Sequence, residues 1–109
     1  YYLFALAHNS PYRIGASAAR RKIRRKQYDL IIDVRTDTER ELLGHAPRDV
    51  HIPRDHLEYT MNEHYPNRNI HILLYCNTGH RARMAADTLQ TMGYTNTEYI
   101  TSSYKSLLR

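Results

Sequence analysis

The segment from Ile70 to Gly93 constrains the fold more than any other part of this sequence. Ile70 to Tyr75 is a bulky, largely apolar run, and Cys76 follows it directly. Such a run, ending at a polar loop, is typical of a strand buried on both faces of a parallel sheet. Beyond the loop, apolar residues recur at helical spacing as far as Gly93, which predicts an amphipathic helix packed on the sheet (Ala82, Ala85, Ala86, Leu89 and Met92).

Further segments predict strands and helices on either side of this unit. Leu30 to Ile32 is a second apolar run that leads into Asp33, and we expect another buried strand there. The remaining predicted elements are a weak strand at Tyr12–Ile14, a helix over Ser17–Gln27 capped by Ser17, a helix over Thr38–Leu43 closed by Gly44, a weak strand at Val50–Ile52, a polar loop over Asn62–Asn69 and a weak strand at Glu98–Ile100. This alternation predicts an α/β fold with three layers, α/β/α, around a central parallel sheet of about five short strands.

The length of the chain bounds its domain organisation. Its 109 residues suffice for one domain, so we expect an N-terminal arm over residues 1–13 and a single domain over residues 14–109. Hydrophobic residues make up 41% of the chain and charged residues 25%, which argues against a disordered tail. The sequence begins without methionine, and we expect a fragment or a processed form. Tyr1 to Ala7 is apolar but too short to span a bilayer, so we expect it to pack on the domain.

Charge and cysteine content narrow the partners and the compartment. A net charge of +5 favours anionic partners, whether small oxyanions, nucleic acid or an acidic membrane surface. The basic run Arg20–Lys26 is interpreted mainly as a solvated helix face, and a nucleic-acid or acidic-lipid patch stays open as the alternative. One cysteine excludes an internal disulfide and fits a reducing compartment. We expect a cytoplasmic protein, with a periplasmic or membrane-tethered domain as the alternative.

The loop after the predicted strand carries the functional hypothesis. Cys76 stands at the carboxyl end of a parallel strand, where open α/β sheets bind their ligands. The next helix begins there, and its unpaired N–H groups and roughly half a positive charge favour a thiolate. Gly79 lets the loop curl so that N–H groups point inward, and Arg81 adds donors for an oxyanion. A lone cysteine is more often a core residue, but this position favours a nucleophile.

The length of the loop separates two kinds of cysteine chemistry. Cysteine-dependent phosphatases need a Cys-x5-Arg loop that wraps a tetrahedral phosphate, whereas here Arg81 follows Cys76 after four residues and Ala82 stands in the later position. The shorter loop suits one sulfur atom carried on the cysteine. An arsenate reductase would usually need another thiol, which this chain lacks. The histidines show no zinc-ligand spacing, and we expect neither a metal nor a cofactor.

Four stretches in order resemble a known family. Cys76 to Arg81 resembles the Cys-x-x-Gly-x-Arg active-site loop of single-domain rhodaneses. Asp29 to Arg35 resembles the family's strand ending in Asp-Val-Arg, and Gly44 to Pro53 resembles its Gly-His-Ile-Pro-Gly-Ala-x-x-Ile-Pro segment. Ala85 to Tyr94 resembles its helix ending in Gly-Tyr. The resemblance covers most of the chain and implies a rhodanese-like fold.

The resemblance also implies an activity and a set of site residues. Cys76 would take a sulfane sulfur from a small anionic donor such as thiosulfate, become a persulfide, and pass the sulfur to cyanide or a thiol. The loop would hold the outer sulfur and the donor (Asn77, Thr78, Gly79, His80 and Arg81), and Arg35 would line the mouth of the pocket. Asp33 is expected to be structural, including through an ion pair with Arg35, and His45 to make turn hydrogen bonds. His80 would either tune the charge of the loop or lie exposed.

Departures from the family pattern motivate competing hypotheses. Ala82 replaces a serine, Pro47-Arg48-Asp49 replaces Pro-Gly-Ala, and the tryptophan that often follows the last strand is absent. Ser102-Ser103 replaces Gly-Gly and would disturb a turn that needs positive φ. The second hypothesis is therefore a catalytically weak or inactive module that binds a protein partner. The third is a nucleic-acid or membrane-surface adaptor that uses Arg20–Lys26. The donor, the acceptor and the oligomeric state are not indicated by the sequence.

Overall fold

The computed structural model describes residues 10–108, and Tyr1–Ala7, expected to pack on the domain, lies outside them. In chain order the elements are α2 (Ala16–Arg24), β1 (Leu30–Asp33), α3 (Asp37–Leu43), β2 (Val50–His51), the 3-10 turn η1 (Arg54–His56), α4 (Leu57–His64), β3 (Ile72–Tyr75), α5 (His80–Thr91), β4 (Thr97–Tyr99) and the 3-10 turn η2 (Tyr104–Leu107). No helix within residues 10–108 is long and apolar enough to cross a membrane.

A parallel sheet forms the centre of the molecule. Its strand order is β2-β1-β3-β4, and β1 pairs with β3 from Leu30 opposite Ile72 to Asp33 opposite Tyr75. The described chain thus forms four strands where about five were predicted. The weak strand predicted at Tyr12–Ile14 is reduced to a single parallel bridge between Arg13 and Tyr99, because Pro11 precedes it and α2 begins soon after it.

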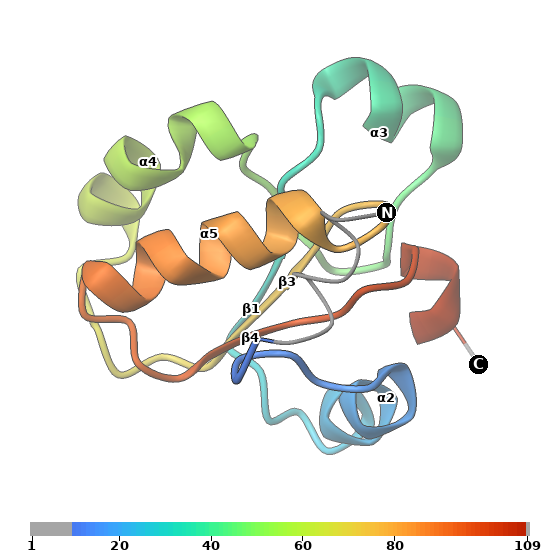
Figure 1. Ribbon diagram of the computed structural model, residues 1–109, viewed down its shortest axis with the longest axis horizontal. Helices are drawn as coiled ribbons and strands as arrows, with labels where there is room; N and C mark the ends of the chain where they lie inside the picture. Colours follow the sequence, from blue (N-terminus) through green and yellow to red (C-terminus); the bar gives the residue numbers. More distant parts are fainter. Residues whose placement is uncertain (1–9, 109) are drawn as a thin grey trace.

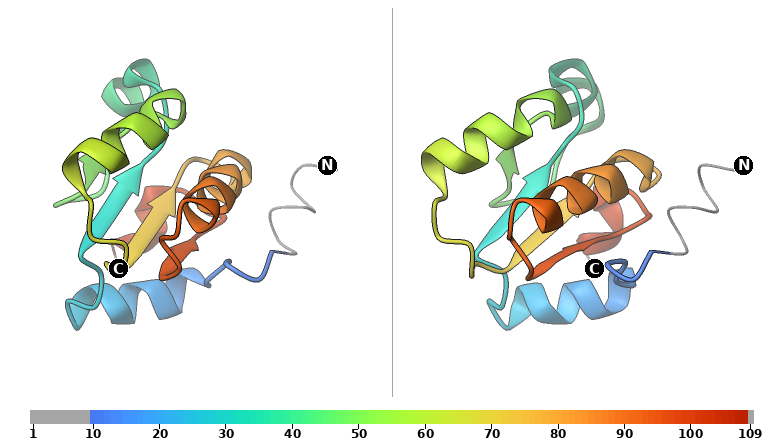
Figure 2. Two further views of the ribbon diagram at one scale, coloured as in Figure 1. Left: turned by 90° about the vertical axis from the view of Figure 1, so that its left-hand side faces the viewer. Right: turned by 60° about the vertical axis from the view of Figure 1, so that its left-hand side comes forward.

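The two faces of the sheet are covered by different elements, as the three-layer prediction required. α4 and α5 lie on one face, and α2 and η2 lie on the other (Figure 1). Figure 2 shows α2 on the side of the strands opposite α4 and α5. Because side chains alternate along a strand, Leu74 of β3 packs toward α5 whereas Leu73 and Tyr75 pack toward α2 and η2. Cys76, which follows Tyr75, therefore belongs to the α5 side.

The helix after the cysteine loop agrees with its prediction. Ala82, Ala85, Ala86 and Leu89 are the buried residues of α5. The helix contacts both β3 and β4, and Gly93 lies just beyond its end with a φ of 99°. The apolar stripe seen in the sequence is thus the surface that joins α5 to the sheet.

Three helix predictions need correction. α4 was not predicted, and it includes the start of the polar loop expected over Asn62–Asn69, because only Leu57 and Met61 of this helix are buried. Ser17 is not the cap of α2: the helix begins at Ala16 after Gly15 and ends at Arg24. The helix expected over Thr38–Leu43 begins one residue earlier, at Asp37.

Candidate active site

The candidate site lies at the carboxyl ends of β1 and β3. β1 connects to β2 on one side, and the chain then returns to β3 on the other, so the connections diverge between β1 and β3. Ligands of open α/β sheets bind at this kind of position. Cys76 follows β3 there, and Arg35 follows β1 at the same edge of the sheet.

Cys76 is almost completely enclosed. Its side chain is 1% exposed and belongs to the apolar cluster between the sheet and α5. The sulfur atom nevertheless has a polar contact, because the backbone N–H of Gly79 donates to Sγ at 3.2 Å. The thiol is therefore buried, with one backbone amide aimed at its sulfur atom.

Gly79 gives the loop its shape. It precedes α5 with a φ of 97°, in the left-handed region that side chains disfavour. A Cβ atom at this position would lie 2.8 Å from Cα of Thr101 and 2.9 Å from its Cγ2. Conformation and space thus both require glycine. The tight turn lets the Gly79 amide reach back to Cys76.

Other amides of the loop are free to bind an anion. Within residues 10–108, the backbone N–H groups of Asn77, Thr78, His80 and Arg81 donate to no protein acceptor. They surround the N-terminus of α5, which carries a partial positive charge. Four N–H groups of the predicted anion nest thus have no acceptor within residues 10–108.

Arg81 does not present a free guanidinium, because it binds Glu39 of α3. Its Nη1 and Nη2 donate to the two carboxylate oxygens of Glu39 at 2.6 Å and 2.7 Å, and Nδ2 of Asn77 donates to Glu39 at 2.7 Å. Hydrogen bonds from Arg81 lower the pKa of Glu39 to about 2, with Thr36 adding to the effect and burial opposing it. The hydrogen bond to Glu39 likewise raises the pKa of Arg81. The guanidinium of Arg81, which was predicted to bind an anionic donor, is thus already bound to the carboxylate of Glu39.

Glu39 is a site residue that the sequence analysis missed. The Thr-x-x-Glu pattern from Thr36 to Glu39 signals a capping box, and that box is present at the start of α3. The pattern could have located the start of the helix. It carries no information about a contact with a loop 42 residues further along the chain.

Arg35 is committed to acceptors within the protein. Its side chain is 1% exposed, and its Nε and Nη2 donate to the two carboxylate oxygens of Asp33 at 2.9 Å and 3.0 Å. Nη2 also donates to the carbonyl of Gly44 at 2.6 Å, and Nη1 donates to Asn77 at 3.2 Å. The structural ion pair considered from the sequence is present. Arg35 therefore ties β1 to the end of α3 and to the cysteine loop.

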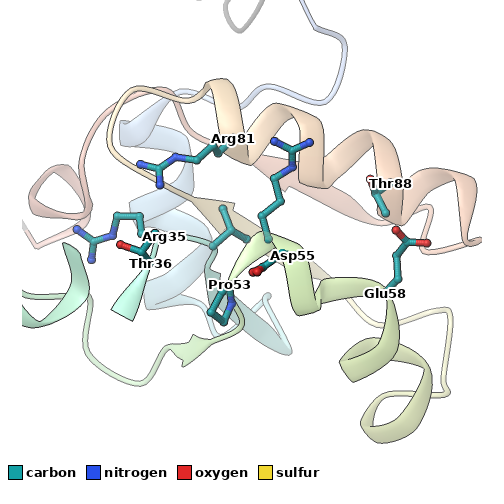
Figure 3. Close-up of a pocket in the computed structure, with 9 residues that line it drawn as sticks. Arg35, Thr36, Pro53, Asp55, Glu58, Arg81 and Thr88 are labelled. Atoms are coloured by element: carbon teal, nitrogen blue, oxygen red, sulfur yellow. The ribbon is translucent and has the colours of Figure 1, made fainter. Parts of the chain in front are cut away.

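A groove of about 450 Å³ opens beside the loop. It runs between α5 and the η1–α4 segment, with Arg35 and Arg81 at one end and Glu58 and Thr88 at the other (Figure 3). Its walls are completed by Val34, Thr36, Pro53, Arg54 and Asp55. Cys76 is not among the lining residues, so the groove leads to the Arg81 side of the loop rather than directly to the sulfur.

The histidines expected near the site have different surroundings. Nδ1 of His45 lies 3.0 Å from the carbonyl of Ala46 and 3.0 Å from Asp49, contacts of the turn type expected. Nδ1 of His80 is buried and has no hydrogen-bond partner among the described residues. No group of three or more His, Cys, Asp or Glu side chains within residues 10–108 is placed to bind a metal ion.

Asp49 forms a buried charged cluster that sequence reasoning also missed. Its side chain is fully buried and accepts two hydrogen bonds from Arg40, at 2.8 Å and 3.0 Å, and one from the hydroxyl of Tyr75. Burial acts against the charged form, but these hydrogen bonds lower the pKa of Asp49. Burial and the hydrogen bond to Asp49 raise the pKa of Tyr75. Asp49 thus anchors the segment before β2 to the end of β3, next to the cysteine.

Two departures from the family pattern have different structural consequences. Arg48, which stands where the family pattern has glycine, has a positive φ of 62°. Ser102 and Ser103 have no positive φ, so the disturbed turn expected there does not arise. Instead, Oγ of Ser102 lies 2.7 Å from Oγ of Ser106, within the η2 turn region.

Comparison with known proteins places the chain among relatives of one family. The model of the rhodanese-like domain family matches residues 16–108. The protein named "Putative sulfur carrier protein YrkF" from Bacillus subtilis (strain 168) is 36% identical over 81 residues, which are 74% of this chain and 42% of that relative. The chain therefore spans less than half the length of this curated relative.

Several solved structures share the fold, including two that cover most of this chain. The human single-domain sulfurtransferase TSTD1 superposes with a TM-score of 0.76 at 19% identity, over 91% of this chain and 96% of that one. A Rhodopseudomonas palustris CGA009 protein of unknown function, described as a possible tyrosine phosphatase, superposes with a TM-score of 0.80 at 23% identity, over 97% of this chain and 86% of that one. At these identities the likeness concerns the fold.

Proposed function

Since this chain belongs to the rhodanese-like domain family, we propose that it is a sulfurtransferase that carries a sulfane sulfur on Cys76. The observation that supports this most is the placement of the thiol at the N-terminus of α5. Sγ accepts the N–H of Gly79, and four further loop amides have no acceptor within the described residues. A persulfide on Cys76 would add one sulfur atom whose negative charge these amides can bind.

Each half of the proposed cycle is a displacement at sulfur. The Cys76 thiolate attacks the outer sulfur of a donor such as thiosulfate, the S–S bond of the donor breaks, and sulfite leaves with the electron pair. A nucleophilic acceptor then attacks the outer sulfur of the Cys76 persulfide. Cyanide leaves as thiocyanate, or a thiolate leaves as a persulfide, and Cys76 returns to a thiolate. No external oxidant or reductant is needed, because the sulfane sulfur is handed over at a constant oxidation level.

The length of the loop supports sulfur transfer over phosphoryl transfer. Four residues separate Arg81 from Cys76, and Ala82, in the position a phosphatase would need for arginine, is fully buried against the sheet. A bound phosphate would therefore lack the arginine that phosphatases place at this position. A single sulfur atom needs only the main-chain donors.

Mass spectrometry of the intact protein tests the proposal. Treatment with thiosulfate should add one sulfur atom, and later addition of cyanide should remove it and release thiocyanate. Cys76→Ser should abolish both steps, with a circular dichroism spectrum like that of the parent as the control for folding. Absence of any sulfur adduct with thiosulfate and with an organic persulfide would overturn the proposal.

A binding module is the second candidate, and the closed state of the site favours it. Cys76 is 1% exposed, and the guanidinium of Arg81 is bound to Glu39. A module of this kind would bind a protein partner and form no persulfide with any donor. A sulfur adduct on Cys76 would contradict it, so the same measurement separates the two candidates.

A further inference from the structure

We infer that Glu39 is a specificity-determining residue: its carboxylate occupies Arg81 as an internal anion and selects against small oxyanion donors in favour of organic persulfides. This inference rests on the proposed sulfur transfer and names the donor class of that same site. It concerns Glu39 and Arg81, two residues whose contact with each other the sequence does not indicate.

The Glu39 carboxylate is held by donors on both sides. Arg81 binds both of its oxygens, Asn77 donates to Oε2 at 2.7 Å, and the backbone N–H and the hydroxyl of Thr36 donate to Oε1 at 3.2 Å and 3.1 Å. Asn77 and Arg81 lie at opposite ends of the loop that encloses Cys76. One carboxylate therefore closes the loop between its two ends.

This arrangement leaves little positive charge for an incoming dianion. Arg81 is paired with Glu39, and Arg35 is paired with Asp33. The groove beside the loop is also lined by Asp55 and Glu58, which offset the further cation there, Arg54. Thiosulfate would have to displace Glu39 from Arg81 to bind its sulfonate group there. The pKa of Glu39, at about 2, keeps it ionised at neutral pH, so protonation does not release Arg81.

The reacting group of an organic persulfide has no oxyanion oxygens that would need Arg81. Its outer sulfur can reach the free amides of the loop while Arg81 and Glu39 stay paired. The Cys76 thiolate attacks that outer sulfur, the S–S bond of the donor breaks, and the donor thiolate leaves with the electron pair. The proton on the outer sulfur stays with it, so atoms and charge balance.

Glu39→Gln tests the inference, and Glu41→Gln is its matched control. The glutamine side chain keeps an oxygen that can accept from Thr36, so the cap of α3 is retained, but the negative charge beside Arg81 is removed. Glu41 lies on the same helix and is exposed. We expect E39Q to lower KM for thiosulfate roughly five- to tenfold. With an alkyl persulfide that carries no carboxylate as donor, E39Q should change kcat/KM by a clearly smaller factor than with thiosulfate, and E41Q should match the parent with both donors.

Anion binding gives a readout that does not need catalysis. In a Cys76→Ser background, calorimetric titration with thiosulfate should show roughly five- to tenfold tighter binding when E39Q is added. Tighter binding without sulfur transfer in any variant that retains Cys76 would support the role of Glu39 and overturn the proposed function. Unchanged binding and an unchanged KM would overturn the role of Glu39 even if transfer proceeds. An equal gain with the alkyl persulfide would also overturn it, because that would indicate a generally looser loop.

Discussion

Two single residues of this domain adopt an unfavourable backbone conformation that the surrounding contacts hold in place. Arg48 and Lys26 are the non-glycine residues with positive φ within residues 10–108, at 62° and 56°. Left-handed conformations cost most side chains about 1–2 kcal/mol. Asp49, next to Arg48, is buried and hydrogen-bonded to Arg40 and Tyr75, so the chain is held in place at the strained position.

Arg48→Gly should therefore stabilise the protein. Glycine adopts a φ of 62° without steric cost, and the expected gain is about 0.5–1 kcal/mol after its larger entropy in the unfolded chain is subtracted. The free energy of unfolding from urea titration measures it. Arg54→Gly is the control, because Arg54 is also an exposed arginine but has no positive φ, and it should show no gain. A loss of stability in Arg48→Gly would show that its side chain contributes more than its backbone costs.

The residues of the site differ in how far the sequence could predict them. Cys76, Gly79 and Arg81 lie within one short segment between a strand and a helix. Their spacing can therefore be recognised from the sequence alone. Glu39 and Asp49 depend on contacts with residues far along the chain, such as Arg81 and Tyr75. No local pattern signals such a pair, because Glu39 or Asp49 alone is typical of a solvated surface charge.

At the scale of elements, the junction between β3 and α5 depends on one close approach. Gly79 precedes α5 and packs against Thr101, which follows β4. The loop is thus confined between its own helix and the segment after the neighbouring strand. This confinement holds the Gly79 amide 3.2 Å from Sγ of Cys76.

Gly79→Ala should damage both stability and sulfur transfer. The added methyl group meets Thr101 and the residue keeps an unfavourable φ, for an expected loss of about 2–4 kcal/mol. Persulfide formation should fall because the amide moves away from the sulfur. Gly15→Ala is the matched control: no atom lies within 4 Å of a Cβ there, and its φ is −71°. Thermal unfolding and intact mass measure the two effects, and equal behaviour of both variants would contradict this account of the loop.

Elements with strong periodicity were predicted, and the weak strands expected at Val50–Ile52 and Glu98–Ile100 form as β2 and β4, whereas α4 was not predicted. β1, β3 and α5 each bury most of their apolar residues, so their patterns are continuous in the sequence. α4 buries Leu57 and Met61 among polar residues, which leaves too short a pattern to separate a helix from a loop. The predicted strand at Tyr12–Ile14 makes one bridge, because neighbouring Pro11 and Gly15 limit how far it can pair.

Across the whole molecule, part of the basic run on α2 serves contacts between layers. Arg20 donates to the carbonyl of Ser106 at 2.7 Å, and Lys22 pairs with Glu98 at 2.8 Å. These contacts join α2 to η2 and to β4. Arg20 and Lys22 are therefore not purely solvated charges, because they also hold the layers together. A nucleic-acid or lipid patch stays a prediction for the remaining charges of Arg20–Lys26.

Global stability should depend on pH through Glu39. Its pKa is lowered in the fold from 4.5 to about 2, so the stability it contributes is fully present above about pH 4.5 and is lost as pH falls toward 2. E39Q lacks this contribution and should be less stable than the parent at neutral pH. The difference should shrink as the pH falls through this window, measured by urea unfolding at several pH values. E41Q should follow the parent, and a difference between E39Q and the parent that is independent of pH would contradict the assignment.

The enclosure of Cys76 has a consequence for the sulfur exchange proposed for it. With 1% of its surface exposed, the thiol should react slowly with bulky alkylating reagents and with peroxide, although an amide polarises its sulfur. A folded protein could reach a sulfur enclosed in this way only by extending a narrow segment or a side chain to the loop after β3. If Cys76 carries a sulfane sulfur as proposed, its transfer to a protein acceptor would therefore require direct contact at the cysteine loop, and the bound sulfur would be shielded from bulk solvent until that contact forms.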